Sequence, residues 1–268
     1  MRKPVPDVTA DAADVPLMRA EGLTKHYGQR IGCQNVALEI HEGEVIAIVG
    51  ESGSGKSTLL GLLSTQLEAT AGRVHYRMLD GETRDLNTLT EAERRMLLRT
   101  DWGFIHQDAR NGLRMGVSAG GNVGERLMAV GWRHYGNIRA EAVDWLGRVE
   151  ISDDRIDDPP TTFSGGMRQR LQIAKNMVTR PRLVFMDEPT GGLDVSVQAR
   201  LLDLIRSFVN DHGLAAIVVT HDLAVARHLS HRTIVMRHGD VIETGLTDQV
   251  LDDPQAPYTQ LLVSSVLQ

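Results

Sequence analysis

The chain has 268 residues, of which 41% are hydrophobic and 24% are charged, and its formal net charge at pH 7 is −6. This length suits one large domain with a sizeable core, and the acidic balance disfavours both non-specific nucleic-acid binding and attachment to an anionic membrane surface. The single cysteine, Cys33, excludes an intrachain disulfide and is expected to be a small core residue.

Two features of the chain bear on its location. No segment approaches the roughly 18 consecutive apolar residues that a membrane-spanning helix needs. Residues 1–15 are rich in Pro, Asp and Ala and lack an apolar centre, so we expect a disordered tail rather than a secretory signal. These features predict a cytoplasmic protein without direct membrane insertion.

The first elements alternate in type. Residues 18–23 and 36–39 are expected to be edge strands of a more antiparallel sheet. Residues 45–49 are apolar and mostly β-branched, which predicts a buried strand, and residues 56–66 carry leucines at the spacing of a helix. This alternation continues later in the chain and favours an α/β fold with a largely parallel sheet.

A glycine-rich stretch joins this buried strand to the helix after it. Residues 50–57 satisfy the phosphate-loop pattern, in which backbone N–H groups and a helix N-terminus surround phosphate oxygens. We expect Lys56 to reach the β- and γ-phosphates of a nucleotide and the Ser57 hydroxyl to bind Mg²⁺. The loop residues expected to bind nucleotide are Gly50, Glu51, Ser52, Gly53, Ser54, Gly55, Lys56, Ser57 and Thr58.

The middle of the chain differs in pattern. Residues 91–99 are rich in strong helix formers, residues 138–149 are a second candidate helix, and residues 151–162 are polar and are expected to be a loop. We expect a helical subdomain inserted into an α/β core. The expected division is a core of about residues 16–89 and 180–246, a helical subdomain of about residues 90–179, and a C-terminal extension of residues 247–268.

A second buried strand, residues 183–186, ends in two acidic residues. Carboxylates in this position lie at the carboxyl edge of a parallel sheet, where ligands bind in such folds. We expect Asp187 to hold Mg²⁺, directly or through water, and Glu188 to orient and polarise an attacking water. An amphipathic helix at residues 195–209 and a third buried strand at residues 215–220 follow.

The sequence Ser164-Gly165-Gly166-Met167 resembles the signature loop of the ABC ATPase family. In that family the loop opens a helix and binds the γ-phosphate held by the partner subunit, and Met167 stands where a glutamine is usual. The resemblance covers about residues 17–243. It implies an ATPase that requires ATP and Mg²⁺, with Ser164, Gly165 and Gly166 at the nucleotide.

Four further residues match motifs of the same family in the expected order. The resemblance implies that Gln107 senses Mg²⁺ and the attacking water, and that His221 contacts the γ-phosphate. It further implies that Tyr27 stacks on adenine and that Asp194 lies in a loop that crosses the dimer interface. Because the phosphate loop and the signature loop lie on different lobes in the family, two subunits complete each site. The partner is therefore expected to be a second copy or another ABC subunit.

The chain also resembles a narrower group within the family, the ABC subunits of the bacterial carbon–phosphorus lyase system. The similar segments are residues 98–103, 108–128, 133–136, 155–158, 160–163 and 262–268. This resemblance implies ATP-driven remodelling of soluble carbon–phosphorus lyase core subunits during phosphonate breakdown.

Two other functions stay open. The first is the ATPase of a peptide or phosphonate importer, because residues 252–262 resemble the C-terminal pattern of such importer subunits. The second is a nucleotide clamp that binds ATP without turning it over. We expect residues 110–126 to form much of the docking surface for the lyase core, which charge reversal at Arg114 or Arg126 would test.

Overall fold

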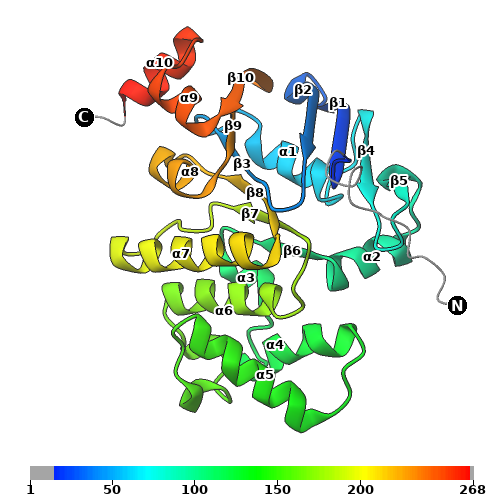
Figure 1. The fold of residues 1–268 in the computed structure, drawn as a ribbon, viewed down its shortest axis with the longest axis vertical. Coiled ribbons are helices and arrows are strands. Elements are labelled where there is room, and N and C mark those ends of the chain that lie inside the picture. Colours follow the sequence, from blue (N-terminus) through cyan, green and yellow to red (C-terminus); the bar gives the residue numbers. More distant parts are fainter. Residues whose placement is uncertain (1–14, 266–268) are drawn as a thin grey trace, which may run out of the picture.

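The fold is built around two β-sheets (Figure 1). The computed structural model describes residues 15–265, so the predicted disordered tail, residues 1–15, lies outside the described residues except for Val15. Within residues 15–265, no helix combines the length and apolar character needed to cross a membrane.

The larger sheet has six strands in the spatial order β10-β9-β3-β8-β7-β6. All its neighbouring pairs are parallel except β10 with β9, which confirms the predicted α/β fold with a largely parallel sheet. Strands β3 and β8 are buried along their whole length because helices and the second sheet cover both faces. The strands are β3 (Val45–Val49), β6 (Trp102–Ile105), β7 (Leu183–Asp187), β8 (Ala215–Val219), β9 (Arg232–Arg237) and β10 (Asp240–Leu246).

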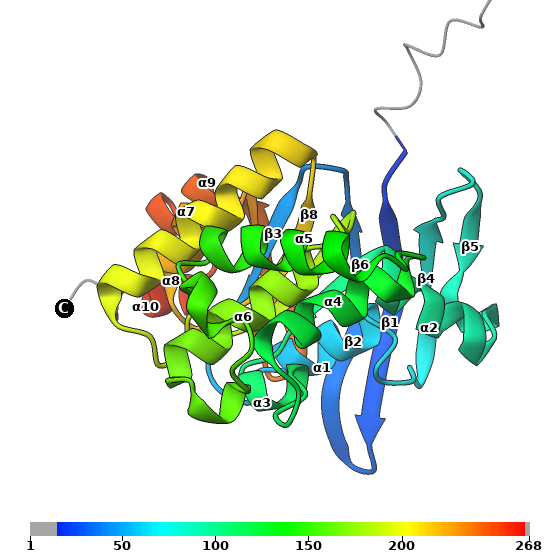
Figure 2. The same cartoon turned by 90° about the horizontal axis from the view of Figure 1, so that it is seen from below.

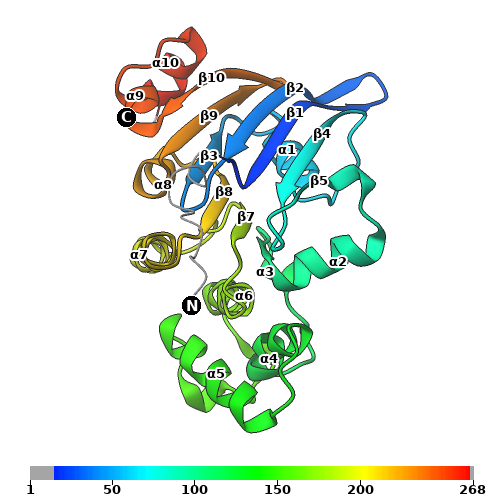
Figure 3. The same cartoon turned by 45° about the vertical axis from the view of Figure 1, so that its right-hand side comes forward.

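The smaller sheet is antiparallel, in the order β2-β1-β4-β5. Its strands are β1 (Met18–Tyr27), β2 (Arg30–Ile40), β4 (Ala71–Arg77) and β5 (Thr83–Asp85). Helix α1 (Lys56–Leu63) packs under this sheet (Figure 3) and shares one apolar core with it, a core that also contains the buried Cys33. The helix ends three residues before the predicted end at residue 66, because Thr65 adopts a left-handed conformation with φ 59°.

Most of the middle region is helical, as predicted. Helices α4 and α5 lie at the end of the molecule opposite β1 and β2, and α6 lies between them and the larger sheet (Figures 1 and 2). The elements of this region are α2 (Glu91–Thr100), α3 (Ala109–Gly112), α4 (Ala119–Ala129), α5 (Tyr135–Arg148) and α6 (Gly165–Met177), with 3₁₀ turns at Leu86–Thr88, Asp153–Arg155 and Pro160–Thr162.

Strand β6 is a correction to the prediction that residues 90–179 form a helical insertion. Trp102–Ile105 pair with β7 and extend the larger sheet. The Trp102 ring packs edge-on against Tyr76 and Phe185, at centroid distances of 5.0 and 5.2 Å. A run of four residues directly after a helix is too short to show the alternation of polar and apolar residues that marks a strand. The sequence pattern therefore did not separate this strand from its helical neighbours.

Asp101 joins the two sheets just before β6. Its buried carboxylate accepts a hydrogen bond of 2.6 Å from the Tyr76 hydroxyl and bonds of 2.9 and 2.6 Å from the Arg182 guanidinium. Arg182 also donates to the Arg77 carbonyl at 2.9 Å. Burial and the neighbouring Asp101 raise the pKa of Tyr76, so its hydroxyl stays protonated as a donor.

The C-terminal part folds back over the strand that precedes the phosphate loop (Figure 1). In a separate apolar cluster, Val250, Leu251 and Tyr258 pack with Ala47 and Val49 of β3. The C-terminal extension is therefore attached directly behind the glycine-rich loop. The remaining helices are α7 (Val195–His212), α8 (Leu223–Leu229), α9 (Thr247–Asp252) and α10 (Pro257–Ser264).

Candidate functional site

A cavity of about 930 Å³ lies at the carboxyl ends of β3 and β7, beside the turn between β1 and β2. It brings together residues that the sequence analysis selected from separate segments of the chain. Three lining residues, Arg30, Ile31 and Gly32, were not predicted, although their position just after Tyr27 in a hairpin could have suggested them. The lining residues are Tyr27, Arg30, Ile31, Gly32, Ser52, Gly53, Gly55, Lys56, Ser57, Thr58, Gln107, Asp187, Glu188 and His221.

Two glycines set the path of the phosphate loop. Gly50 has φ 145°, and a Cβ atom there would lie 2.2 Å from the Met236 carbonyl oxygen. Gly55, the N-cap of α1, has φ 107°, and its Cβ would lie 2.2 Å from the Gly32 carbonyl oxygen. Any larger residue would push the loop off β9 or off the hairpin, so the backbone can curl only with glycine at both positions.

Lys56 is buried at the floor of the cavity. Its ammonium group donates to the carbonyl oxygens of Gly50 at 2.7 Å and Glu51 at 2.9 Å. Burial lowers the pKa of Lys56, and the negative charges of Glu188 and Asp187 act in the opposite direction. Gly50, Glu51 and Ser54, which were predicted with the loop, are not among the residues that line the cavity.

The Ser57 hydroxyl and the Asp187 carboxylate meet across the cavity. The Ser57 Oγ donates to Asp187 Oδ1 at 3.3 Å. Burial raises the pKa of Asp187, and the hydrogen bond from Ser57 opposes that shift. Gln107 lines the same cavity, so the site offers a hydroxyl, a carboxylate and an amide oxygen, and these oxygen ligands fit Mg²⁺.

Glu188 has an unusual backbone and two side-chain partners. Its φ is 47°, a left-handed conformation that is strained for a residue other than glycine and is held by its N–H bond to the Val219 carbonyl at 2.9 Å. One carboxylate oxygen lies 2.8 Å from His221 Nδ1, and the other accepts from the Thr220 hydroxyl at 3.4 Å. The His221 side chain is 71% exposed, whereas that of Glu188 is 13% exposed. The strained turn thus aims a mostly covered carboxylate into the cavity.

The other predicted site residues lie elsewhere. The Ser164 Oγ caps α6 by accepting from the Met167 N–H at 3.2 Å. Gly165 lines a second cavity of about 270 Å³, together with Gln107 and residues 191–193. Ser164, Gly165, Gly166 and Asp194 are absent from the lining of the larger cavity in the described part of the chain. A single chain therefore keeps the signature loop apart from the phosphate loop.

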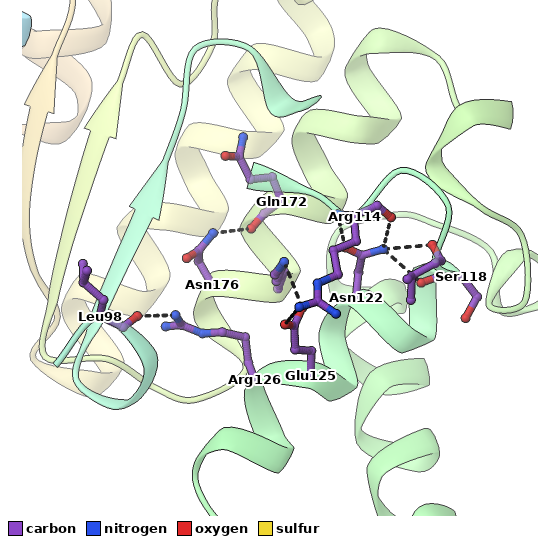
Figure 4. Close-up of polar contacts among 10 residues, drawn as sticks. Leu98, Arg114, Ser118, Asn122, Glu125, Arg126, Gln172 and Asn176 are labelled. Atoms are coloured by element: carbon purple, nitrogen blue, oxygen red, sulfur yellow. Dashed lines mark hydrogen bonds and ion pairs between the residues drawn. The ribbon is translucent and has the colours of Figure 1, made fainter. Parts of the chain in front are cut away.

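The segment of residues 110–126 is fastened by a buried amide (Figure 4). The Asn122 Oδ1 accepts from the Arg114 N–H at 2.8 Å, and its Nδ2 donates to the carbonyls of Arg114 at 3.0 Å, Val117 at 3.0 Å and Ser118 at 3.1 Å. The Arg114 side chain stays 66% exposed and pairs with Glu125 at 3.0 Å. The loop is therefore held in place, and it presents two exposed arginines, Arg110 and Arg114.

The burial of Arg126 makes it unsuitable for the charge-reversal test of the docking surface. Its guanidinium is buried and donates to the carbonyl oxygens of Leu98 and of Trp102, the latter at 2.6 Å. Reversing its charge would place an unpaired carboxylate against buried carbonyls and damage the fold. Arg114, in contrast, can be reversed without breaking a buried contact.

Comparisons with known proteins agree with this geometry. A sequence model of the ABC transporter family matches residues 33–191. The ATP-binding protein PhnK of Escherichia coli (strain K12), named for phosphonates utilization, is 61% identical over 253 residues, which cover 94% of this chain and 98% of that protein. The dipeptide transport ATP-binding protein DppD of the same organism is 34% identical over 260 residues, covering 93% of this chain and 78% of that protein.

Solved structures with the same fold include dimeric ATP-binding cassettes. The dimer of the ATP-binding cassette MJ0796 in a post-hydrolysis state, bound to ADP and Pi, gives a TM-score of 0.78 at 29% identity, covering 86% of this chain and 98% of that chain. CbiO1 of Clostridium perfringens, part of an ABC transporter complex, gives a TM-score of 0.74 at 27% identity, covering 89% of this chain and 91% of that chain.

Proposed function

This chain belongs to the ABC transporter family and is an ATPase, and from that premise we propose that it drives remodelling of a soluble carbon–phosphorus lyase core during phosphonate breakdown. The observation that carries the proposal is the 61% identity to PhnK over 94% of the chain, because so long a match includes the segments outside the nucleotide motifs. The proposal places the protein in the cytoplasm, where ATP is available.

We assign the nucleotide to the larger cavity. The N-terminus of α1 and the N–H groups of the loop face anionic oxygens there, and Lys56 exchanges its two loop carbonyls for the β- and γ-phosphates. Tyr27 and the adjacent hairpin residues also line this cavity, which suits stacking of the Tyr27 ring against adenine.

Hydrolysis in this proposal depends on Glu188. Its carboxylate accepts a hydrogen bond from the attacking water and so orients the water toward the γ-phosphorus. His221 holds one oxygen of that carboxylate, and with Nδ1 protonated it donates to Glu188, since an ionised carboxylate can only accept.

Mg²⁺ would be held by Ser57, Asp187 and Gln107, and when bound it would neutralise phosphate charge. Burial raises the pKa of Asp187, and the same burial makes this carboxylate a suitable ligand. A carboxylate that is partly removed from water is stabilised more by a nearby cation than an exposed one.

Two subunits are required for a complete site in this proposal. The signature residues Ser164, Gly165 and Gly166 start helix α6 and lie outside the larger cavity. A second copy, or another ABC subunit, would present its own signature loop and Asp194 to the nucleotide held here. The dimers formed by the MJ0796 cassette support this arrangement.

The first test is phosphate release by the purified protein with ATP and Mg²⁺, compared with a Glu188→Gln variant. We expect the variant to bind ATP and dimerise but to lose turnover by at least about a hundredfold, because it keeps the shape and loses the anionic acceptor. Equal turnover in both proteins would instead support a nucleotide clamp that does not use Glu188.

The second test concerns the partner. We expect affinity purification of the tagged chain from its own cells to recover soluble carbon–phosphorus lyase subunits, and we expect Arg114→Glu to weaken that recovery without changing ATPase activity. Arg73→Glu is the matched control, since Arg73 is an exposed arginine on β4 that, like Arg114, pairs with one carboxylate. Recovery unaffected by Arg114→Glu would remove residues 110–126 from the docking surface.

An importer ATPase is the second candidate function. It is favoured by the 34% identity to DppD, a dipeptide transport protein, which extends over 93% of this chain. In that case the same purification, carried out on solubilised membranes, would recover a multi-helix permease in place of lyase subunits.

A further inference from the structure

Strand β6 is the terminal strand of the larger sheet, so one of its edges has no neighbouring strand. The backbone groups on such an edge need other hydrogen-bond partners when they are buried. At β6 these partners are side chains from α4 and α6. They contact alternate residues, 102 and 104 in the strand and 106 directly after it. Alternation is expected because every second residue of a strand points its N–H and C=O to the same edge.

Helix α6 supplies most of these partners. The Asn176 Oδ1 accepts from the Phe104 N–H at 3.1 Å. The Gln172 Oε1 accepts from the His106 N–H at 2.7 Å, while its Nε2 donates to the His106 carbonyl at 3.0 Å. A single carboxamide thus pairs with His106 as a neighbouring strand would. Gln172 and Asn176 lie on one helix beside Arg126 of α4, whose guanidinium approaches the start of β6 (Figure 4).

A third carboxamide side chain of α6, that of Gln169, belongs to the same group of contacts. We call Gln169, Gln172 and Asn176 the carboxamide ladder. The spacing of three and four residues places all three side chains on one face of α6. Each is 6% exposed or less. A buried carboxamide without partners costs about 1–3 kcal/mol, so the ladder is stable only while α6 stays in register with β6.

Gln169 differs from the other two because it contacts two segments. Its Nε2 donates to the His106 carbonyl at 3.3 Å and to the Pro189 carbonyl at 3.0 Å. The first carbonyl immediately precedes Gln107, and the second immediately follows Glu188. Both of these neighbours line the larger cavity. One buried amide group, that of Gln169, therefore joins the loop that carries Gln107 to the loop that carries Glu188.

The position of Gln169 on its own helix completes the argument. It lies in the second turn of α6, which begins at the Ser164 cap. Gln169 is 4% exposed and lies beside the second cavity of about 270 Å³, and its amide stays on both carbonyls only while that helix end keeps its position against β6.

We propose that Gln169 is a positioning residue that couples the signature end of α6 to Gln107 and Glu188. Gln169 would bring the Gln107 and Glu188 side chains into their catalytic positions only when the signature end of α6 binds the nucleotide held on the partner subunit. This inference rests on the proposed function, since it assigns Glu188 to water activation and the signature loop to the partner's nucleotide. The coupling acts through two hydrogen bonds at fixed carbonyls and needs no contact between Gln169 and ATP.

The test compares Gln169→Met with Gln172→Met in the full-length chain. Methionine keeps the length of the side chain and removes its polar atoms. Gln172 lies on the same face of α6 and holds His106 but does not contact Pro189 in the structure's described residues. A role limited to stability predicts that Gln172→Met loses at least as much turnover as Gln169→Met, because it leaves the His106 N–H unpaired and its carbonyl with only the 3.3 Å bond from Gln169.

We expect the reverse. Gln169→Met should lower kcat about tenfold, and Gln172→Met should lower it less than about threefold although it lowers the melting temperature more. ATP affinity and ATP-dependent dimerisation should stay within about twofold of the unchanged protein in both variants. If kcat follows the loss of stability in the two variants, or if Gln169→Met turns over ATP normally, the proposal is wrong.

Two further variants keep the outcome interpretable. Should Gln169→Met not fold, Gln169→Asn makes the same comparison, because it retains a buried carboxamide that is one methylene too short to reach both carbonyls. Glu188→Gln separates this inference from the proposed function. Normal turnover in Glu188→Gln would overturn the proposed role of Glu188, whereas an inactive Glu188→Gln beside a normal Gln169→Met would overturn only the coupling.

Discussion

Lys56 and Tyr258 hold opposite ends of the same peptide unit. The Lys56 ammonium donates to the Gly50 carbonyl at 2.7 Å, and the Tyr258 hydroxyl accepts from the Glu51 N–H at 3.2 Å. These two groups belong to the peptide bond between Gly50 and Glu51. The C-terminal helix α10 is thereby connected to the phosphate loop, although it lies outside residues 33–191, which the family model matches.

Tyr258→Phe is expected to weaken ATP binding. The ring stays under the Arg237 guanidinium, 4.7 Å from it, but the Glu51 N–H loses its acceptor and the first peptide of the loop is free to turn. The loss of one buried hydrogen bond corresponds to about a fivefold to tenfold rise in Kd. Titration with a fluorescent nucleotide measures the change. Tyr135→Phe, at a 73% exposed tyrosine on α5, should leave the Kd unchanged, and an equal effect of both changes would refute the link.

His221→Ala should lower turnover while leaving ATP affinity nearly intact. The 2.8 Å contact from Nδ1 fixes one Glu188 oxygen, and without it the carboxylate keeps only the 3.4 Å bond from Thr220. We expect kcat to fall about a hundredfold with KM changed less than about threefold. His228→Ala is the control, since His228 pairs with Asp203 on the surface. A variant that raised KM and preserved kcat would place His221 in binding rather than in hydrolysis.

Arg126→Met should destabilise the fold by about 3 kcal/mol, because three acceptors lose a charged donor and the Leu98 and Trp102 carbonyls stay buried. Burial lowers the pKa of Arg126 to about 10, which still leaves it fully charged at neutral pH. Urea unfolding followed by circular dichroism measures the change. Arg139→Met removes an exposed pair with Asp157 and should cost less than about 1 kcal/mol.

His106 is expected to make stability depend on pH. Burial lowers the pKa of His106 below its ordinary value of 6.5, so the unfolded chain binds its proton first as the pH falls. Stability should therefore decrease as the pH falls below about 6.5, until the lower pKa of the folded state is reached. Urea unfolding at about pH 7.5 and about pH 5.5 should show a smaller decrease for His106→Phe than for the unchanged protein. Equal decreases would show that other groups cause the effect.

Sequence patterns located the elements that carry the phosphate chemistry. The strand Val45–Val49 was predicted with its observed bounds, because an apolar β-branched run between glycines has few alternatives. The strand that ends at Asp187 and the helix that starts at Val195 were also placed correctly. These elements follow from local patterns and from the phosphate-loop spacing, and so could be predicted without the fold.

Other features depend on contacts between distant residues. Strand β6 was missed because its pairing with β7 and its packing on Tyr76 leave no periodic signal. The burial of Arg126 was missed because an arginine in a polar helix is exposed by default, and only the fold places its guanidinium against the Trp102 carbonyl. The contact of Tyr258 with Glu51 spans 207 residues and has no counterpart in local sequence.

The carboxamide ladder has a consequence for the solubility of this protein. An open strand edge is a template on which a second sheet can grow, and many proteins protect such edges with charge or with a covering element. Here amide side chains occupy the edge of β6, and they can do so only while α6 lies against it. Motion during the ATPase cycle must therefore carry α6 and β6 together, since a movement that parted them would uncover a surface prone to aggregate.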